Sequence, residues 1–143
     1  MTVLGVGVDV VRTSRFAEIL KRSPTILDRI SKRILHPVEH TNYQSSSQAR
    51  QLQILASTWA VKEATFKSLS IGDQRRFKFA EWRRVNRLHG YEMIQTILQP
   101  QENDKPSVIK EVIREDRILV STSHDGDYTI ANALRQTTLN NVA

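Results

Sequence analysis

The stretch from residue 48 to residue 71 constrains the fold most, because it has the features of one long helix. It contains neither proline nor glycine, and it is rich in residues that favour helices. At about 100° per residue, one face of this helix collects apolar side chains, and we expect that face to be buried. Its members are Leu52, Leu55, Ala56, Trp59 and Phe66.

Glu63 falls within roughly 20° of Leu52 in the same projection, in the middle of the face that we expect to be buried. Lys67 follows one turn later, at the edge of that face. A carboxylate on an apolar face is costly unless it is paired or binds a metal. The alternative is an ordinary Glu–Lys pair on a solvated helix, which stabilises a helix by only a few tenths of a kcal/mol, roughly.

A β-strand is predicted at residues 3–11, where β-branched residues dominate. Gly5, Gly7 and Asp9 point to one side of this strand, and we expect the two glycines to leave room for a close approach to the backbone. An aspartate at a strand end is either a metal ligand or a turn residue. The third glycine of a dinucleotide-binding fingerprint is missing, which excludes that class of site.

Two short amphipathic helices should follow the first strand. Thr13 or Ser14 can cap the first, and Ser23-Pro24 can begin the second. Arg15 and Arg22 belong to the basic surface of the first helix, which is either a solvated face or a dock for an acidic partner. Residues 37–48 form either a short helix or a mobile loop.

Beyond the long helix we expect mostly strands, at residues 76–88 and 91–98, while residues 108–113 suit a strand or a helix. Arg75, Arg76 and Lys78 form a cluster that could hold phosphates or simply begin the next strand in solvent.

The last unit, residues 117–134, reads as a β-hairpin with Asp125-Gly126 at its turn. Ser121 and Ser123 share one face of its first strand. His124 ends that strand, at the place where side chains reach the rim of a site.

Composition narrows the class of protein. With 143 residues, the chain should form one domain, residues 1–143, with a proper core. The net charge of +6 indicates an anionic partner, which could be nucleic acid, a nucleotide-like substrate or an acidic protein. The absence of cysteine excludes disulfides and thiolate metal sites. No apolar run approaches the length that spans a membrane.

Three motifs together resemble the phosphopantetheinyl transferases, particularly the short holo-acyl-carrier-protein synthase type. Residues 5–9, GVGVD, match the opening G-x-G-x-D of that family. Residues 59–67, WAVKEATFK, match its W/F-x-x-K-E-A-x-x-K signature, and residues 121–124, STSH, match its closing S-x-S/T-H. Order and spacing agree across nearly the whole chain, and Lys105-Pro106 is similar to the family's G-K-P.

The chain departs from the family at three places. Thr58 stands where the family often has arginine, residues 70–73 contain less glycine than usual, and Asp104 replaces the glycine of G-K-P. These departures concern the contacts to cofactor phosphates and leave the class unchanged. They are more typical of a eukaryotic, organellar member, so we expect the mitochondrial matrix or the cytoplasm as its compartment.

The resemblance implies an α+β fold in which an antiparallel sheet packs against a long central helix. It also implies transfer of 4′-phosphopantetheine from coenzyme A to a serine of an apo acyl carrier protein, with release of 3′,5′-ADP. In this reading Asp9 and Glu63 bind Mg²⁺, Glu63 helps to remove the serine proton, and Lys67 stabilises the leaving phosphate. Further contacts to coenzyme A would come from Lys62, Arg76, Ser123 and His124.

The family also implies partners. An acidic acyl carrier protein would dock on the helix that carries Arg15 and Arg22, and small members are usually homotrimers with sites between protomers. A basic nucleic-acid-binding module is the alternative, because aromatic residues interleave with the arginines of residues 75–87. That reading lacks a recognised nucleic-acid motif and leaves Asp9 and Glu63 without a role. A catalytically inactive relative of the same fold is a third reading.

Overall fold

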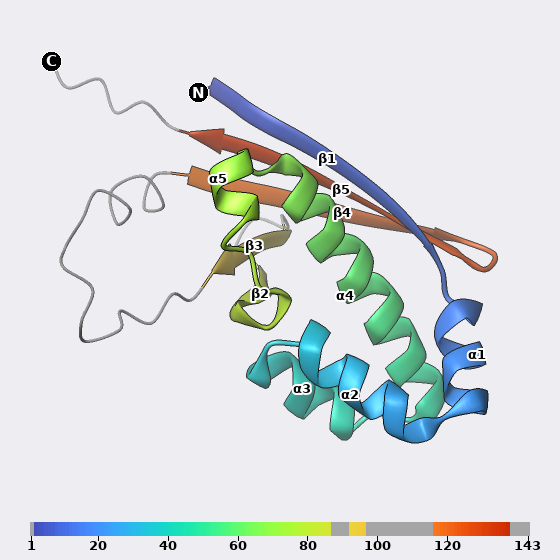
Figure 1. Ribbon diagram of the computed structural model, residues 1–143. Helices are drawn as coiled ribbons and strands as arrows, with labels where there is room; N and C mark the ends of the chain where they lie inside the picture. The colour runs from blue at the N-terminus through green and yellow to red at the C-terminus, as the bar shows by residue number, and fades with distance from the viewer. Residues whose placement is uncertain (1, 87–91, 97–115, 138–143) are drawn as a thin grey trace, which may run out of the picture.

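The computed structural model describes residues 2–86, 92–96 and 116–137. One strand comes first along the chain, the helices follow it, and the other four described strands come after the helices (Figure 1). The elements are β1 (Thr2–Arg12), α1 (Ser14–Arg22), α2 (Pro24–Ile34), α3 (Pro37–Gln44), α4 (Gln48–Ser68), α5 (Ile71–Gln74), a 3-10 turn (Phe79–Glu81), β2 (Trp82–Asn86), β3 (Glu92–Thr96), β4 (Asp116–Asp125) and β5 (Tyr128–Thr137).

The five strands form one antiparallel sheet in the order β1-β5-β4-β3-β2. The hairpin of β4 and β5 turns at Gly126 and Asp127, and Gly126 adopts a φ of 54°, which glycine reaches without steric cost. This confirms the predicted hairpin, with its turn one residue later than the expected Asp125-Gly126. In the sheet register Ala131 stands between Asp9 of β1 and Thr122 of β4.

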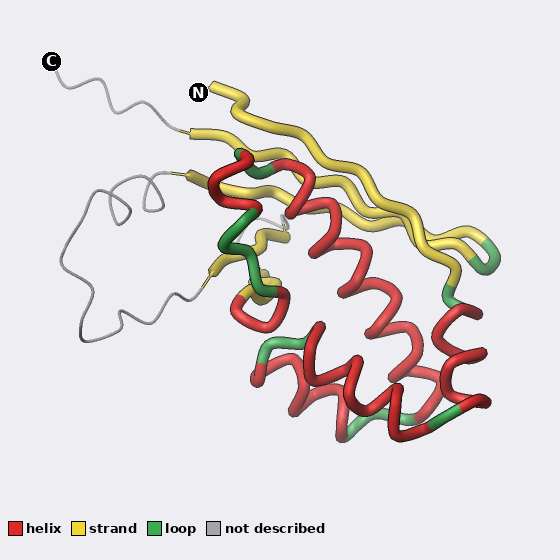
Figure 2. The backbone as a smooth tube through the Cα atoms, viewed as in Figure 1, coloured by secondary structure: helices red, strands yellow, loops and turns green. Residues whose placement is uncertain are grey.

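Helix α4 lies between the sheet and the short helices (Figures 1 and 2). It contacts β1 and β5 on one side and α1, α2 and α3 on the other. The fully buried side chains of the core come largely from α4, including Leu55, Ala60 and Val61. The expected α+β fold, with an antiparallel sheet against a long central helix, is confirmed. None of the described helices is both long enough and apolar enough to cross a membrane.

The two glycines of β1 let the backbone of α4 rest directly on the strand. A Cβ atom on Gly7 would come within 1.8 Å of the carbonyl oxygen of Ala64, and one on Gly5 within 2.0 Å of the carbonyl oxygen of Ser68. The room that the sequence predicts beside Asp9 is therefore filled by the helix. This contact fixes the distance between α4 and β1, and so places Glu63 beside Asp9.

We expect Gly7→Ala to destabilise the protein by about 1–3 kcal/mol, because its Cβ would meet backbone that cannot rotate away. Chemical denaturation would measure the change. Gly72→Ala is the matched control, since a Cβ there has no neighbour within 4 Å and α5 tolerates alanine. Equal stabilities of the two variants would contradict this account of the β1–α4 contact.

Several local expectations need adjustment. Residues 37–48 contain a helix, α3, whose first turn is closed by a capping box between His36 and Glu39. Of residues 76–88, only Trp82–Asn86 are strand among the described residues, because Phe79–Glu81 first form a 3-10 turn. Strand β3 lies within the predicted residues 91–98. Residues 104–106 and 108–113 lie outside the described residues.

Candidate functional site

The face of α4 that the sequence predicts to be buried is buried only in part. Leu55 and Ala56 are fully buried, as expected, whereas Leu52, Trp59 and Phe66 are half-buried. The reason is that α4 is covered on two sides, by the sheet and by the short helices. The remaining face opens to solvent and carries Glu63, half-buried, and Lys67, exposed.

Asp9, Glu63 and Lys67 meet where β1 crosses this open face. The ammonium nitrogen of Lys67 lies 2.8 Å from Oδ1 of Asp9 and 3.0 Å from the carbonyl oxygen of Val8. Lys67 is therefore tied to the strand by an ion pair with Asp9. The Asp9 side chain is only 14% exposed, so this pair is partly shielded from water.

The pKa of Glu63 is raised above its ordinary value. Burial is the largest cause, and the nearby carboxylate of Asp9 adds to it, while Lys67 and Arg15 act in the opposite direction. Two carboxylates that repel one another beside an open face form a donor set suited to a hard cation. Among the described residues no group of three or more potential protein ligands gathers, so a cation here would take its other ligands from water or substrate.

Lys62, the neighbour of Glu63 in the signature, points roughly 100° away from it around α4, and it is completely buried, at 0% exposed. Its ammonium donates to the carbonyl oxygens of Ile34 (2.6 Å) and Phe79 (2.8 Å) and to Oε2 of Glu39 (2.8 Å). Burial lowers the pKa of Lys62, and Glu39 opposes that change. An ammonium has three donors, and all three are used here. The expected phosphate contact of Lys62 therefore does not fit this arrangement.

The structure places His124 and Ser123 away from the carboxylate pair. Nδ1 of His124 lies 2.9 Å from Oγ1 of Thr129, near the hairpin tip and two strands away from β1. Ser123 is exposed on the opposite face of β4. Within one chain these two residues cannot act at the same point as Asp9.

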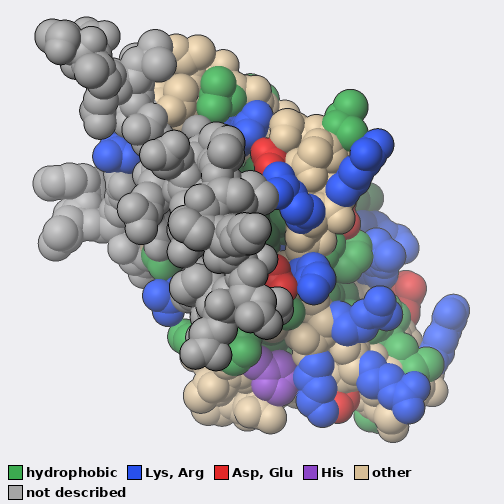
Figure 3. Space-filling model, turned by 60° about the vertical axis from the view of Figure 1, so that its left-hand side comes forward, with side chains coloured by type: hydrophobic (Ala, Val, Ile, Leu, Met, Phe, Trp, Pro, Cys, Tyr) green, Lys and Arg blue, Asp and Glu red, His purple; other side chains and the backbone are tan. Residues whose placement is uncertain are grey.

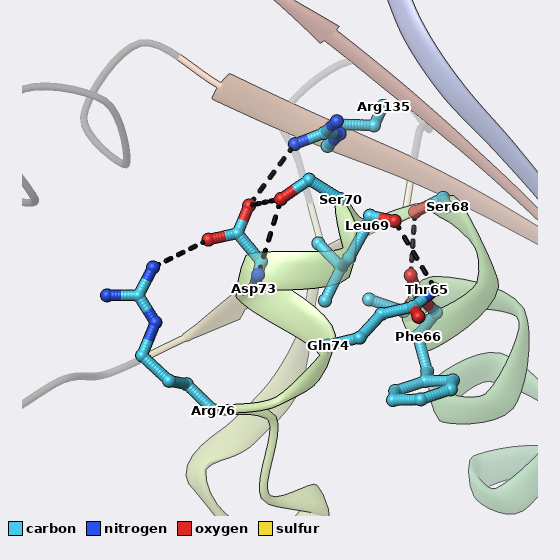
Figure 4. Close-up of polar contacts among 9 residues, drawn as sticks. All are labelled: Thr65, Phe66, Ser68, Leu69, Ser70, Asp73, Gln74, Arg76 and Arg135. Atoms are coloured by element: carbon cyan, nitrogen blue, oxygen red, sulfur yellow. Dashed lines mark hydrogen bonds and ion pairs between the residues drawn. The ribbon is translucent and has the colours of Figure 1, made fainter.

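Arg76 is also separate from the carboxylate pair. Its guanidinium forms an ion pair with Asp73 at 3.0 Å, and Asp73 also lies 3.5 Å from the guanidinium of Arg135 on β5 (Figure 4). The Oγ atom of Ser70 donates to the same carboxylate at 2.7 Å. This cluster holds α5 against the sheet, and the side chain of Arg76 remains about half exposed.

A cavity of about 660 Å³ lies between the first half of α4 and the tip of the β4–β5 hairpin. Its wall includes His124, Thr122 and two guanidinium groups, those of Arg50 and Arg84. Neither arginine was among the predicted contacts to coenzyme A, because nothing in the local pattern of a helix or strand distinguishes a cavity arginine from a solvated one. Their common location depends on α4 and β2 meeting in space.

The cavity and the carboxylate pair occupy opposite faces of α4. At about 100° per residue, Arg50 points roughly 140° away from Glu63, and Ile54, which also lines the cavity, points roughly 180° away. One chain therefore presents two separate half-sites, one acidic and one basic.

The basic surface expected on α1 is present. Arg15 and Arg22 are exposed, and the guanidinium of Arg15 lies 5.8 Å from the ring centre of Trp59, beside Glu63. Lysine and arginine side chains outnumber acidic ones on the face shown in Figure 3. This arrangement places positive charge next to the carboxylate pair.

The aromatic residues that suggested a nucleic-acid surface pack against each other instead. The rings of Trp59 and Phe79 stack at 5.3 Å, and Phe77 makes edge contacts with Phe66 and Phe79. Rings that already cover one another do not offer their faces to bases, so the structure gives no support to the nucleic-acid reading.

Comparison with solved structures identifies the same fold. A holo-(acyl-carrier-protein) synthase from Bacillus anthracis str. Ames, solved in complex with CoA (3′,5′-ADP), aligns with a TM-score of 0.69 at 20% identity, over 96% of this chain and 100% of that chain. The Chronobacterium ammoniagenes ACPS–CoA complex aligns with a TM-score of 0.63 at 26% identity, over 96% of this chain and 99% of that chain.

Sequence comparison identifies the family. Holo-[acyl-carrier-protein] synthase of Bacillus pumilus (strain SAFR-032) is 32% identical over 130 residues, which cover 91% of this chain and 93% of the relative. The protein of the same name from Anoxybacillus flavithermus is 30% identical over 132 residues, 92% of this chain and 94% of the relative. The model of the 4′-phosphopantetheinyl transferase superfamily matches residues 5–133. The resemblance carried by the three motifs is confirmed, and the chain belongs to the 4′-phosphopantetheinyl transferase superfamily.

Proposed function

We infer that this protein is a holo-acyl-carrier-protein synthase, which transfers 4′-phosphopantetheine from coenzyme A to a serine of an apo acyl carrier protein. The observation that carries this inference is the meeting of Asp9, Glu63 and Lys67 on one open seam between β1 and α4. These residues come from two of the three family motifs, and the fold brings them within reach of one substrate. Family membership supports the class of reaction.

In the reaction that we propose, Glu63 accepts the proton of the carrier serine, directly or through a water molecule. The serine oxygen forms a bond to the β-phosphorus of coenzyme A, the bond from that phosphorus to the nucleotide oxygen breaks, and 3′,5′-ADP leaves. Lys67, held by Asp9, donates to the leaving phosphate and stabilises its charge.

The residues present fit a magnesium site. Asp9 and Glu63 would hold the ion, because their carboxylates lie close enough for Asp9 to raise the pKa of Glu63. Mg²⁺ binds through one or two carboxylates and keeps substrate phosphates and waters as its other ligands. When bound, it would neutralise charge on the pyrophosphate.

The cavity beside the hairpin is our proposed site for the nucleotide half of coenzyme A. It offers the guanidiniums of Arg50 and Arg84 and the imidazole of His124, and its volume of about 660 Å³ is within the usual range for a small-molecule pocket. The exposed Arg15 and Arg22 of α1 would dock the acidic carrier. The net charge of +6 agrees with both anionic partners.

We further propose a homotrimer in which the acidic half-site of one protomer faces the basic half-site of its neighbour. Two features support this. The half-sites lie on opposite faces of α4, and the outer face of edge strand β1 exposes large apolar side chains that a second copy would cover, notably Val6, Val8 and Val10, at 51–61% exposed. Light scattering should then report three times the 16.4 kDa of one chain.

Mixing two inactive variants tests the shared site. Glu63→Gln damages the acidic half-site and Arg50→Met the basic one, so each variant alone should be nearly inactive. Unfolding and refolding them together should restore a substantial fraction of activity, because some interfaces then combine two intact half-sites. A mixture as inactive as its components, although it forms trimers, would contradict sharing between protomers.

The proposed reaction is tested by intact-mass spectrometry of an apo acyl carrier protein incubated with this protein, coenzyme A and Mg²⁺. We expect the carrier to gain the mass of phosphopantetheine, and EDTA to prevent the gain. Coenzyme A binding without any gain on several carriers would contradict the proposed reaction.

The expected mitochondrial location stays a prediction, for which the two bacterial relatives named above give no support. The proposal that the chain works in the cytoplasm or the mitochondrial matrix is tested by fractionation of the source cells. Recovery of the protein with the organelle would favour the matrix.

A further inference from the structure

Helix α1 begins beside the tip of the β4–β5 hairpin (Figure 1). The sequence predicts a local cap from Thr13 or Ser14, but the side chain of Thr13 makes no capping hydrogen bond with the described residues. None of the residues in the first turn of α1 is acidic. The N–H groups and the positive end of this helix therefore need a partner from elsewhere in the chain.

Asp127 is that partner, although it lies 113 residues away from Ser14 along the chain. Its Oδ1 atom accepts from the backbone N–H of Ser14 at 2.9 Å, and its Oδ2 atom accepts from the Ser14 hydroxyl. Its carbonyl oxygen accepts from the N–H of Thr13 at 2.8 Å. The two bonds from Ser14, first that of the hydroxyl, lower the pKa of Asp127 below its ordinary value. An ionised carboxylate from the hairpin therefore caps α1.

The residue that follows Ser14 is Arg15, whose guanidinium lies 5.8 Å from the ring centre of Trp59 on α4. Burial raises the pKa of Glu63, and Arg15 is close enough to act in the opposite direction. Because the first turn of a helix fixes the direction in which its side chains leave, the cap at Ser14 sets where the charge of Arg15 lies. Asp127 therefore controls, through one residue, a cation beside the carboxylate pair.

Asp127 also lines the cavity proposed for the nucleotide, together with Thr13. A negative charge at this place repels phosphate groups, so a contact with the phosphates of the nucleotide does not explain it. Both carboxylate oxygens accept hydrogen bonds from Ser14 instead. These contacts point to a role in the position of α1 and not in the binding of coenzyme A.

We propose that Asp127 is a positioning residue for carrier binding: acting through Ser14, it holds the first turn of α1 so that Arg15 meets the acidic carrier. The proposal rests on the proposed function, in which α1 docks the carrier. It makes recognition of the carrier depend on the tip of a distant hairpin. Without this cap only a fraction of the molecules would present Arg15 correctly, and the carrier would bind correspondingly more weakly.

Steady-state kinetics of phosphopantetheine transfer, with the carrier and coenzyme A varied in turn, test this assignment. Asp127→Ala should raise the KM for the carrier about 3- to 10-fold, which is within the usual effect of losing a helix cap. The kcat and the KM for coenzyme A should stay nearly unchanged. Asp127→Asn keeps one acceptor for the N–H of Ser14, so its KM for the carrier should lie between those of the two proteins.

The change of charge gives the experiment a matched control. Removing a carboxylate makes the protein more positive, and Coulomb attraction alone would then make an acidic carrier bind more tightly. Asp125→Ala makes the same change of charge at an exposed position of the same hairpin tip. We expect it to keep the KM for the carrier or to lower it, whereas Asp127→Ala should raise that KM.

The decisive variant combines Asp127→Ala with Arg15→Met. If Asp127 acts by positioning Arg15, the alanine should add little to the KM for the carrier that Arg15→Met already has, whereas independent effects would multiply. Multiplied effects would overturn the assignment. So would a folded Asp127→Ala variant with an unchanged KM for the carrier, or one that mainly loses affinity for coenzyme A. If the unchanged protein modified no carrier, the proposed function would fail instead, so the two failures are distinguishable.

Discussion

Changing Glu63 to glutamine is expected to lower the rate of phosphopantetheine transfer about 10²- to 10⁴-fold, the usual contribution of a positioned acid or base. Glutamine has nearly the same shape but cannot accept the serine proton, and it is a poor ligand for Mg²⁺. Transfer measured by intact-mass spectrometry at saturating substrates would report the change. Glu81→Gln, outside the seam, is the control and should keep full activity.

The same variant should be more stable than the unchanged protein at neutral pH. The folded state raises the pKa of Glu63 above its ordinary value of 4.5, so between these two values the folded protein binds more protons than the unfolded chain. The free energy of unfolding therefore falls as the pH rises through that window. Above the window, the charged form of Glu63 costs the folded state part of its stability. Glutamine removes this cost, whereas below the window the two proteins should be equally stable.

Thermal unfolding at several pH values checks the sign, and Mg²⁺ adds a second readout. Because a ligand that binds only the folded state stabilises it, Mg²⁺ should raise the melting temperature of the unchanged protein more than that of Glu63→Gln. Two results would contradict the role given to Glu63. The first is a rate of phosphopantetheine transfer that Glu63→Gln leaves unchanged. The second is a stability of Glu63→Gln, relative to that of the unchanged protein, that is lower at pH 7 than at pH 4.

Changing Lys62 to methionine should destabilise the fold by about 3–5 kcal/mol, the range for removing one partner of a buried ion pair. The carboxylate of Glu39 and the carbonyl oxygens of Ile34 and Phe79 would all lose their donor at once. Since domains are stable by only about 5–15 kcal/mol, this change removes a large part of the total. Urea denaturation would measure the loss.

The exposed pair of Lys32 and Asp28 gives a matched control. It has the same separation of 2.8 Å, but its side chains are 60% and 54% exposed. Lys32→Met should therefore change stability by only about 0–1 kcal/mol. If both methionine variants were equally stable, the buried network around Lys62 would not hold the fold together as described.

The sequence predicted the structure best where a single local pattern, such as a helix cap, a turn dipeptide or a family motif, was strong. Helix α4 begins at Gln48 as expected, because Ser47 caps a long stretch without proline or glycine. The hairpin forms where it was expected, but its two turn residues are Gly126 and Asp127, one position later than Asp125-Gly126, because Gly126 supplies the positive φ of the turn. Motifs at Asp9 and Glu63 indicated the carboxylate pair correctly, since the glycines of β1 bring α4 against the strand.

Periodicity failed where α4 is covered on two sides. A helix with two partners buries most of its circumference, so the expected apolar stripe no longer identifies the core. The same geometry explains Lys62, which was expected to contact coenzyme A but is enclosed by α2, α3 and the 3-10 turn. The cavity that Arg50 and Arg84 share was not predicted, because these residues lie 34 positions apart and no local pattern reports that they meet.

The backbone contact at Gly5 and Gly7 has a consequence for how activity is lost. The spacing of Asp9 and Glu63 depends on two main chains in direct contact, and softening of side-chain packing does not change it. Heating should therefore leave the carboxylate pair intact until the whole chain unfolds. Enzyme activity and the folded structure should then be lost at the same temperature.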